Sequence, residues 1–109
     1  MTARFDSTRE IIIRTPDFDA AVAHYEHTLN LPKSYDSPSI VGFETGSFCL
    51  YIERGEKHGV VFEFLVPDLA AARTQLLSAG CTLVEEDASV PRCYLRDPYG
   101  LTFNIRQRG

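Results

Sequence analysis

The sequence predicts an α+β fold made of two copies of one β-α-β-β-β module. The first observation is a strand-like stretch at 60–66 that stops at Pro67 and passes directly into a helix start at Asp68. The second is that the same plan occurs 51 positions earlier, at Pro16 and Asp17. Neither half is large enough to bury its own hydrophobic face. One domain is therefore expected over 1–109, with modules at about 9–54 and 59–107.

The first module begins with a strand at 9–14, because three consecutive isoleucines favour extended backbone and Pro16 removes the next hydrogen-bond donor. Asp17 stands where a helix N-cap is expected, and the helix is predicted to end near Asn30. The buried face of this helix is predicted from apolar residues at helical spacing, namely Phe18, Ala21, Val22, Tyr25 and Leu29.

After this helix, residues 32–38 are polar and rich in turn formers, which predicts a loop or a poorly formed edge strand. Strands at 39–44 and 48–53 follow, joined by Thr45-Gly46-Ser47, whose glycine suits a hairpin turn. The charged segment 54–59 has no periodicity and is the expected connection between the modules.

The second module repeats this order. Asp68 is the expected N-cap of its helix and Gly80 the residue that ends it. The inward face of this helix is predicted to carry Leu69, Ala72, Leu76 and Leu77. A tight turn is predicted at Asp97-Pro98-Tyr99-Gly100. The remaining strands are predicted at 82–85, 92–96 and 101–106.

Composition narrows the class of partner. The net charge of −4 gives no basic field for a phosphate backbone, so nucleic acid is not an expected partner. No apolar run approaches the roughly 20 residues of a membrane span, and the N-terminus lacks the apolar core of a signal peptide. A cytoplasmic location is expected. The three cysteines are widely spaced in apolar surroundings and are predicted to be buried free thiols.

Alternation along the strands separates two faces of the predicted sheet. One face is apolar and is expected to pack beneath the helices; it carries Ile11, Ile13, Phe62, Phe64, Val66, Phe103 and Ile105. The other face mixes aliphatic side chains with Glu10, Arg14, Glu63, Asn104 and Arg106. Such a mixture suits a partly solvated small-molecule pocket, although an ordinary solvent-exposed sheet face is the alternative. Aromatic residues available to line a groove are Phe43, Phe48, Tyr51, Tyr94 and Tyr99.

Three segments together resemble the glyoxalase, bleomycin-resistance and extradiol-dioxygenase superfamily, also called vicinal oxygen chelate. They are Pro-Asp-Phe-Asp-Ala-Ala-Val-Ala-His-Tyr at 16–25 with Leu-Asn-Leu at 29–31, Phe-Leu-Val-Pro-Asp-Leu-Ala-Ala-Ala at 64–72, and Asp-Pro-Tyr-Gly at 97–100 before a strand. The resemblance covers nearly the whole chain. It implies a U-shaped mixed sheet around a concave cavity, with the helices on the convex side, and commonly a homodimer.

Enzymes of that superfamily hold a divalent metal through side chains on four strands. The resemblance places three of these positions on Glu10, Val61 and Asn104, and the fourth within 50–52, where the register is open. Valine cannot coordinate a metal, and a neutral Asn carbonyl is a poorer ligand than a carboxylate. None of Leu50, Tyr51 or Ile52 is a usual ligand for a hard divalent ion. No metal or other cofactor is therefore expected, with a divalent metal as the alternative.

The sequence thus favours a metal-free protein that binds a small organic ligand, similar to the bleomycin-resistance branch, for sequestration of an antibiotic or metabolite. The predicted ligand-binding residues are Glu10, Arg14, Glu63, Asn104, Phe43 and Tyr51. A floor carrying Glu10 and Glu63 favours a cationic ligand. The alternatives are a metal-dependent lyase, isomerase or dioxygenase with atypical ligands, an enzyme in which Glu10 or Glu63 is a general base, and a non-catalytic dimerisation or regulatory module.

Overall fold

The computed structural model describes residues 4–89 and 92–108, which form an α+β fold. These residues divide into two compact units. The N-terminal unit spans Arg9–Val61, and the C-terminal unit combines the chain before Arg9 with the chain from Phe62 onward. Within the described ranges, the helices are too short or too polar to cross a membrane.

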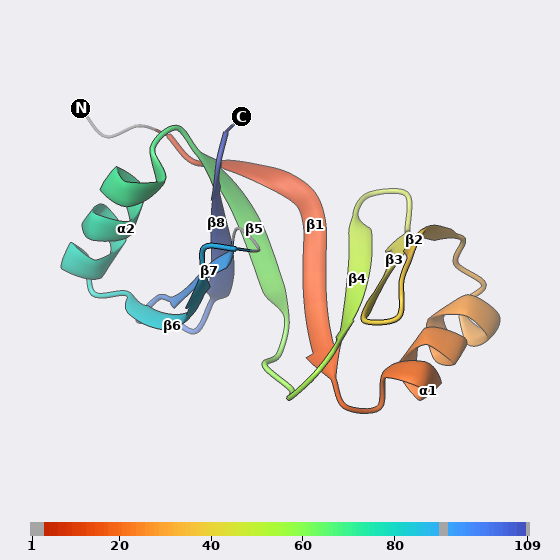
Figure 1. The fold of residues 1–109 in the computed structure, drawn as a ribbon. Coiled ribbons are helices and arrows are strands. Elements are labelled where there is room, and N and C mark those ends of the chain that lie inside the picture. Colours follow the sequence, from red (N-terminus) through yellow and green to blue (C-terminus); the bar gives the residue numbers. More distant parts are fainter. Residues whose placement is uncertain (1–3, 90–91, 109) are drawn as a thin grey trace. The chain divides into compact units, whose positions relative to one another are not determined.

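The N-terminal unit is a four-stranded sheet with one helical segment (Figure 1). Its strands lie in the order β2-β3-β4-β1; β1 and β4 run parallel, and the other neighbours run antiparallel. The elements are β1 (Asp6–Thr15), α1 (Phe18–Ala23), the π-helix η1 (His24–Thr28), β2 (Lys33–Asp36), β3 (Ile40–Glu44) and β4 (Cys49–Arg54). Within the segment 32–38, predicted as a loop or weak edge strand, Lys33–Asp36 form the short edge strand β2, whose residues are all exposed.

The C-terminal unit has the same plan, with strand order β5-β8-β7-β6 and a parallel β5–β8 pair (Figure 1). Its elements are β5 (Val61–Val66), α2 (Leu69–Ser78), β6 (Thr82–Asp87), β7 (Arg92–Arg96) and β8 (Thr102–Gln107). The α+β class and the repeated strand-helix-strand-strand-strand order are confirmed.

Each unit has its own core between its helix and one face of its strands, although the sequence predicted that neither half would bury its hydrophobic face alone. In the C-terminal unit Val66, Leu95, Phe103 and Ile105 are buried together with Ala72 of α2. In the N-terminal unit the buried cluster consists of Phe18, Val41, Phe43 and Ile52, with Ile13 and Tyr25 packed against it. Most of the residues predicted to pack beneath the helices do so. Phe62 does not and is 40% exposed, because the core includes Phe64 and Val66 but does not extend to Phe62.

The first helix departs from the predicted α-helical spacing after Ala23. From His24 onward the backbone bonds to the fifth residue, as in the Leu29 N–H to His24 carbonyl bond of 3.2 Å. This wider winding changes which residues share a face. Leu29, predicted to point inward, is therefore 47% exposed. Leu77 of α2 also lies farther out than predicted, at 36% exposed.

The two Pro-Asp helix starts differ in their hydrogen bonds. Asp68 has extended backbone and accepts the Ala71 N–H at 3.0 Å, as predicted for an N-cap. Asp17 occupies the N-cap position of α1 with φ −88° and ψ 47°, but within the described chain its carboxylate caps no backbone N–H. Its own N–H instead donates to Thr15 Oγ1 at 3.1 Å. Valine stands at the equivalent position 66 and has no hydroxyl to offer.

This difference predicts unequal effects of removing the two carboxylates. Asp68→Ala is expected to lower the free energy of unfolding by about 1 kcal/mol, because a formed cap is lost. Asp17→Ala should change it by less than about 0.5 kcal/mol, the usual range for a surface substitution. Urea unfolding of the two variants and the wild type measures both changes. Equal losses would show that both aspartates cap their helices in solution.

The predicted turn chemistry at the helix end and before β8 is observed. Gly80 has φ +100°, which favours glycine, and the following Cys81 N–H returns to the Leu76 carbonyl at 3.0 Å. Asp97 Oδ1 accepts the N–H groups of Tyr99 at 2.9 Å and Leu101 at 3.0 Å. These backbone hydrogen bonds, that from Leu101 first, lower the pKa of Asp97. The turn therefore fixes the start of β8, on which Asn104 lies.

Candidate functional site

The strand register identifies which of residues 50–52 corresponds to the fourth metal-ligand position of the superfamily, which the sequence left open. In the N-terminal unit β1 and β4 place Glu10 opposite Cys49 and Ile12 opposite Tyr51. In the C-terminal unit β5 and β8 place Glu63 opposite Asn104. Glu63 follows Ile12 by 51 positions, the offset of the repeat. The partner of Ile12 therefore corresponds to the partner of Glu63, which makes Tyr51 the counterpart of Asn104.

A closed polar network occupies the C-terminal unit on the strand face opposite α2. Asn104 is 4% exposed; its Oδ1 accepts the Cys93 backbone N–H at 2.7 Å, and its Nδ2 donates to Glu63 Oε2 at 2.9 Å. Glu63 is 5% exposed, and its Oε1 accepts from Arg106 Nε at 3.3 Å and Nη2 at 3.1 Å. Both Glu63 oxygens and both polar atoms of the Asn104 amide thus have partners inside the protein, as a buried network requires.

These residues do not fit the metal implied by the resemblance. Val61 is fully buried and has no donor atom. The Asn104 oxygen is turned to a backbone N–H and its amide nitrogen to Glu63. Within the described ranges 4–89 and 92–108, no group of three or more His, Cys, Asp or Glu side chains is placed to hold a metal ion. A hard cation prefers several carboxylate or carbonyl oxygens, which these positions do not supply.

The matching face of the N-terminal unit also contains a close ion pair. Arg14 Nε lies 2.7 Å from Glu53 Oε1, and the two side chains are only 12% and 17% exposed. The Tyr51 ring lies across Gly42 of β3, where an added Cβ would come within 2.8 Å of the ring. Glycine at 42 therefore provides the space for Tyr51 on this face.

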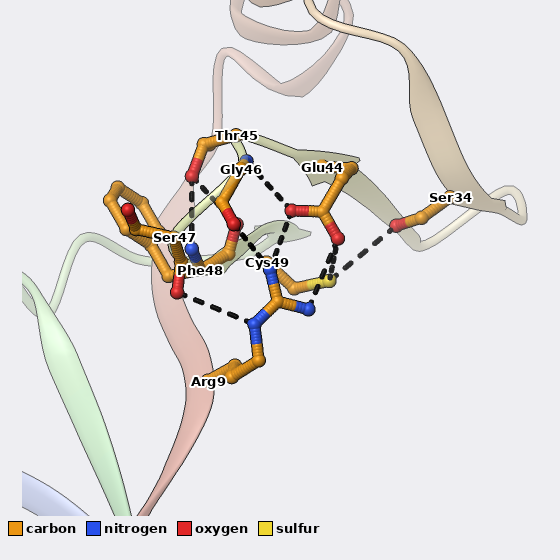
Figure 2. A network of polar contacts seen from close by, with 8 residues as sticks. All are labelled: Arg9, Ser34, Glu44, Thr45, Gly46, Ser47, Phe48 and Cys49. Carbon is orange, nitrogen blue, oxygen red and sulfur yellow. Dashed lines mark hydrogen bonds and ion pairs between the residues drawn. The ribbon is translucent and has the colours of Figure 1, made fainter.

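An arginine-centred network holds the β3–β4 hairpin (Figure 2). Cys49, at the start of β4, pairs in register with Glu10. Arg9 binds both oxygens of Glu44, at 2.7 and 3.1 Å, and also donates to the Gly46 and Ser47 carbonyls. The hydrogen bond from Arg9 is the main cause that lowers the pKa of Glu44. The Cys49 thiol lies 3.9 Å from Glu44 Oε1. The Glu44 carboxylate is therefore committed to fixing the turn.

The predicted site residues separate into three places. Glu63 and Asn104 meet in the buried network, whereas Glu10, Arg14 and Tyr51 lie on β1 and β4 of the other unit. Phe43, predicted to bind ligand, is fully buried and packs on Tyr25 beneath the helix, with ring centroids 6.1 Å apart. Its side chain alternates with Gly42 and therefore faces the core rather than the mixed face. Phe43 is removed from the ligand-binding set.

The acidic floor predicted from the sequence is neutralised at Glu63, and two further carboxylates of these strand faces also pair with arginines. Glu63 pairs with Arg106, Glu53 with Arg14, and Glu85 with Arg92 at 2.9 Å. The Arg92 guanidinium also lies 5.3 Å from the centre of the Tyr94 ring. Of the two predicted floor carboxylates, Glu63 is therefore neutralised by an arginine, whereas the contribution of Glu10 to a cationic ligand stays a prediction.

An open pocket of about 460 Å³ lies beside α1 in the N-terminal unit. The end of β1 contributes Ile13 and Arg14, the helical segment contributes Asp17, His24 and Tyr25, and the segment before β5 contributes Lys57 and Val60. Two small residues, Ala20 and Ala21, lie between the polar groups of the helix and leave room above it. The volume is within the range of about 300–1,000 Å³ typical of ligand pockets.

Arg14 is the one lining residue of this pocket that also belongs to the predicted ligand-binding set. A signal for the others exists in the helix, where Asp17, Ala20, Ala21 and His24 have the spacing of one face. Two alanines between two polar residues on a helix face indicate a hollow rather than a packed surface. The contribution of Lys57 and Val60 is not readable from periodicity, because their segment has none.

Several solved structures have the same fold as this chain. A glyoxalase/bleomycin resistance protein/dioxygenase superfamily member from Vibrio splendidus 12B01 is 16% identical, with a TM-score of 0.66 over 98% of this chain and 100% of that one. The Mn(II)-bound glyoxalase from Novosphingobium aromaticivorans is 20% identical, with a TM-score of 0.64 over 95% of this chain but 39% of its own. An extradiol ring-cleaving dioxygenase from B. fuscum is 17% identical, with a TM-score of 0.61 over 94% of this chain and 33% of its own. The fold is that of the vicinal-oxygen-chelate superfamily.

The family follows from the sequence itself. The model of the glyoxalase-like domain matches residues 10–106, which is most of the chain. The protein therefore belongs to the glyoxalase-like domain family. A search of curated proteins found no match.

Proposed function

We propose that the protein binds a small organic molecule without a metal ion. The observation that carries this proposal is the ligand-sized pocket beside α1, which is lined by apolar and aromatic side chains together with polar and charged ones. The absence of a metal is supported by two of the family's ligand positions: Asn104 uses both polar atoms of its amide for internal hydrogen bonds, and Val61 has no donor atom.

An enzymatic role for Glu63 has little support. Both of its oxygens accept hydrogen bonds, and one of them lies against the Arg106 guanidinium. A general base needs an oxygen within reach of the substrate proton. The role of Glu10 as a base stays a prediction, as do the homodimer and the cytoplasmic location.

Two measurements test the proposal. Protein purified without a metal-affinity tag is expected to contain far less than one equivalent of Fe, Zn, Ni or Mn by elemental analysis. A stoichiometric metal that is lost in Glu10→Ala would contradict the metal-free assignment.

A thermal-shift screen against cationic antibiotics and aldehyde–thiol adducts tests ligand binding. At least one compound is expected to raise the melting temperature of the protein, because ligands that bind only the folded state stabilise it. A screen without any stabilising compound would contradict the binding function.

A further inference from the structure

We propose that the pocket beside α1 takes an organic cation, with its ammonium group at Asp17 and its apolar or aromatic body against Tyr25 and Val60. This assignment rests on the proposed small-molecule binding and names the class of ligand. The carboxylate that would bind the cation is Asp17, not Glu53 or Glu63 of the strands, which are paired with arginines.

The Asp17 carboxylate is available to a ligand. It lines the pocket, is exposed, and does not cap its helix. Among residues 4–89 and 92–108, no cation pairs with it. Its backbone is nevertheless held in place, because its N–H donates to the hydroxyl of Thr15, a residue only 8% exposed. A carboxylate on a fixed backbone loses little conformational freedom when it binds a cation.

The pocket walls suit the apolar part of such a ligand. The Tyr25 ring is half-buried, supported from behind by Phe43, and in edge contact with His24 at a centroid distance of 5.2 Å. Val60 is 50% exposed at the edge. A ring placed here would cover exposed apolar surface, and the face of a tyrosine also attracts cations.

The cations of the pocket do not favour an anionic ligand. Arg14 lies 2.7 Å from Glu53 and is committed to that ion pair. Lys57 is exposed and extends from a segment without regular secondary structure. Binding an anion there requires ordering a long flexible side chain, and Asp17 would repel the anion.

A second pocket of about 440 Å³ lies along the other face of α1 and provides a useful contrast. It is richer in charged residues, but these are already paired with one another. Arg54 lies 3.3 Å from Asp19, and Lys33 lies 3.3 Å from Asp36 and 3.6 Å from Glu26. Only the first pocket combines an apolar wall with a carboxylate that has no partner within the described residues.

Three probes with the same phenyl body test the charge preference: 2-phenylethylammonium, 2-phenylethanol and 3-phenylpropionate. Titrations at pH 7 followed by amide chemical shifts report both affinity and location. The ammonium compound is expected to bind most tightly, with shifts at residues around Tyr25 and Val60. Asp17→Asn should weaken it about three- to fivefold, the upper range for an exposed ion pair, and leave 2-phenylethanol unchanged. Lys57→Met should strengthen it by up to about threefold, because a repelling charge is removed.

Asp19→Asn is the matched control, since it removes a carboxylate from the same helix outside this pocket. It is expected to leave all three affinities unchanged. Tighter binding of 3-phenylpropionate, or stronger ammonium binding in Asp17→Asn, would overturn the cation assignment and leave small-molecule binding in place. If no probe shifts signals around the pocket, the assignment is likewise overturned, and the thermal-shift screen decides separately whether the protein binds ligands elsewhere.

Discussion

Replacing Phe43 with alanine is expected to lower the free energy of unfolding by about 3–5 kcal/mol, the largest effect predicted for a single substitution in this chain. Phe43 is fully buried and packs with Val41, Ile52 and Phe18 between β3 and α1. Removing its ring leaves a cavity that neighbouring side chains fill only in part. Because small domains have a total stability of about 5–15 kcal/mol, the variant should be close to unfolding. Chemical denaturation followed by circular dichroism measures the loss.

Two further variants separate packing from ligand binding at this position. Tyr35→Ala changes an aromatic residue that is 52% exposed on the edge strand β2, and it should cost less than about 1 kcal/mol. Phe43→Leu retains most of the buried volume and is expected to keep ligand affinity unchanged. A variant that stays stable but loses ligand binding would return Phe43 to the ligand-binding set.

Glu63→Ala is expected to cost about 2–3 kcal/mol, because it leaves the buried amide nitrogen of Asn104 without its partner. The cost stays at the low end for a buried ion pair since the Arg106 side chain is 44% exposed and can return to water. Glu63→Gln should cost less, because a Gln carbonyl still accepts from Asn104. The cost of Glu63→Gln relative to the wild type reports the contribution of the charge, and the further cost of Glu63→Ala reports the hydrogen bond to Asn104 and the lost packing.

An exposed arginine–glutamate pair in the same unit serves as the control for the Glu63 variants. Arg73 and Glu86 lie 2.9 Å apart with side chains 36% and 42% exposed. Glu86→Ala should cost less than about 1 kcal/mol, as measured by the same denaturation experiment. Equal costs for Glu63→Ala and Glu86→Ala would show that the network around Asn104 adds nothing beyond a surface ion pair.

The features that the sequence predicted well depend on local chemistry. The helix start at Asp68 and its end at Gly80 require only neighbouring residues, and both are present as expected. The repeated Pro-Asp pair fixed the order of elements for the same reason. Leu29 was placed on the wrong side because the prediction assumed α-helical winding, whereas η1 is wound more widely.

The candidate site was less predictable because its contacts join distant parts of the chain. The partners of Glu63 are 41 and 43 residues away, at Asn104 and Arg106, and only the β5–β8 register brings them together. Parity placed these side chains on one face but gave no indication that they neutralise one another. Part of the pocket beside α1 is formed by the segment before β5, whose sequence has no periodicity. Residue spacing could therefore predict only the residues that the helix contributes to the pocket.

The hydrogen bond between Thr15 and Asp17 also separates the roles of the two aspartates of the repeat. The carboxylate of Asp68 restrains the first turn of α2 by accepting the Ala71 N–H. Asp17 is restrained through its own N–H, so its carboxylate is not used by the helix and lines the pocket beside Tyr25. The same residue of the module therefore serves helix stability in one copy and the surface of a pocket in the other.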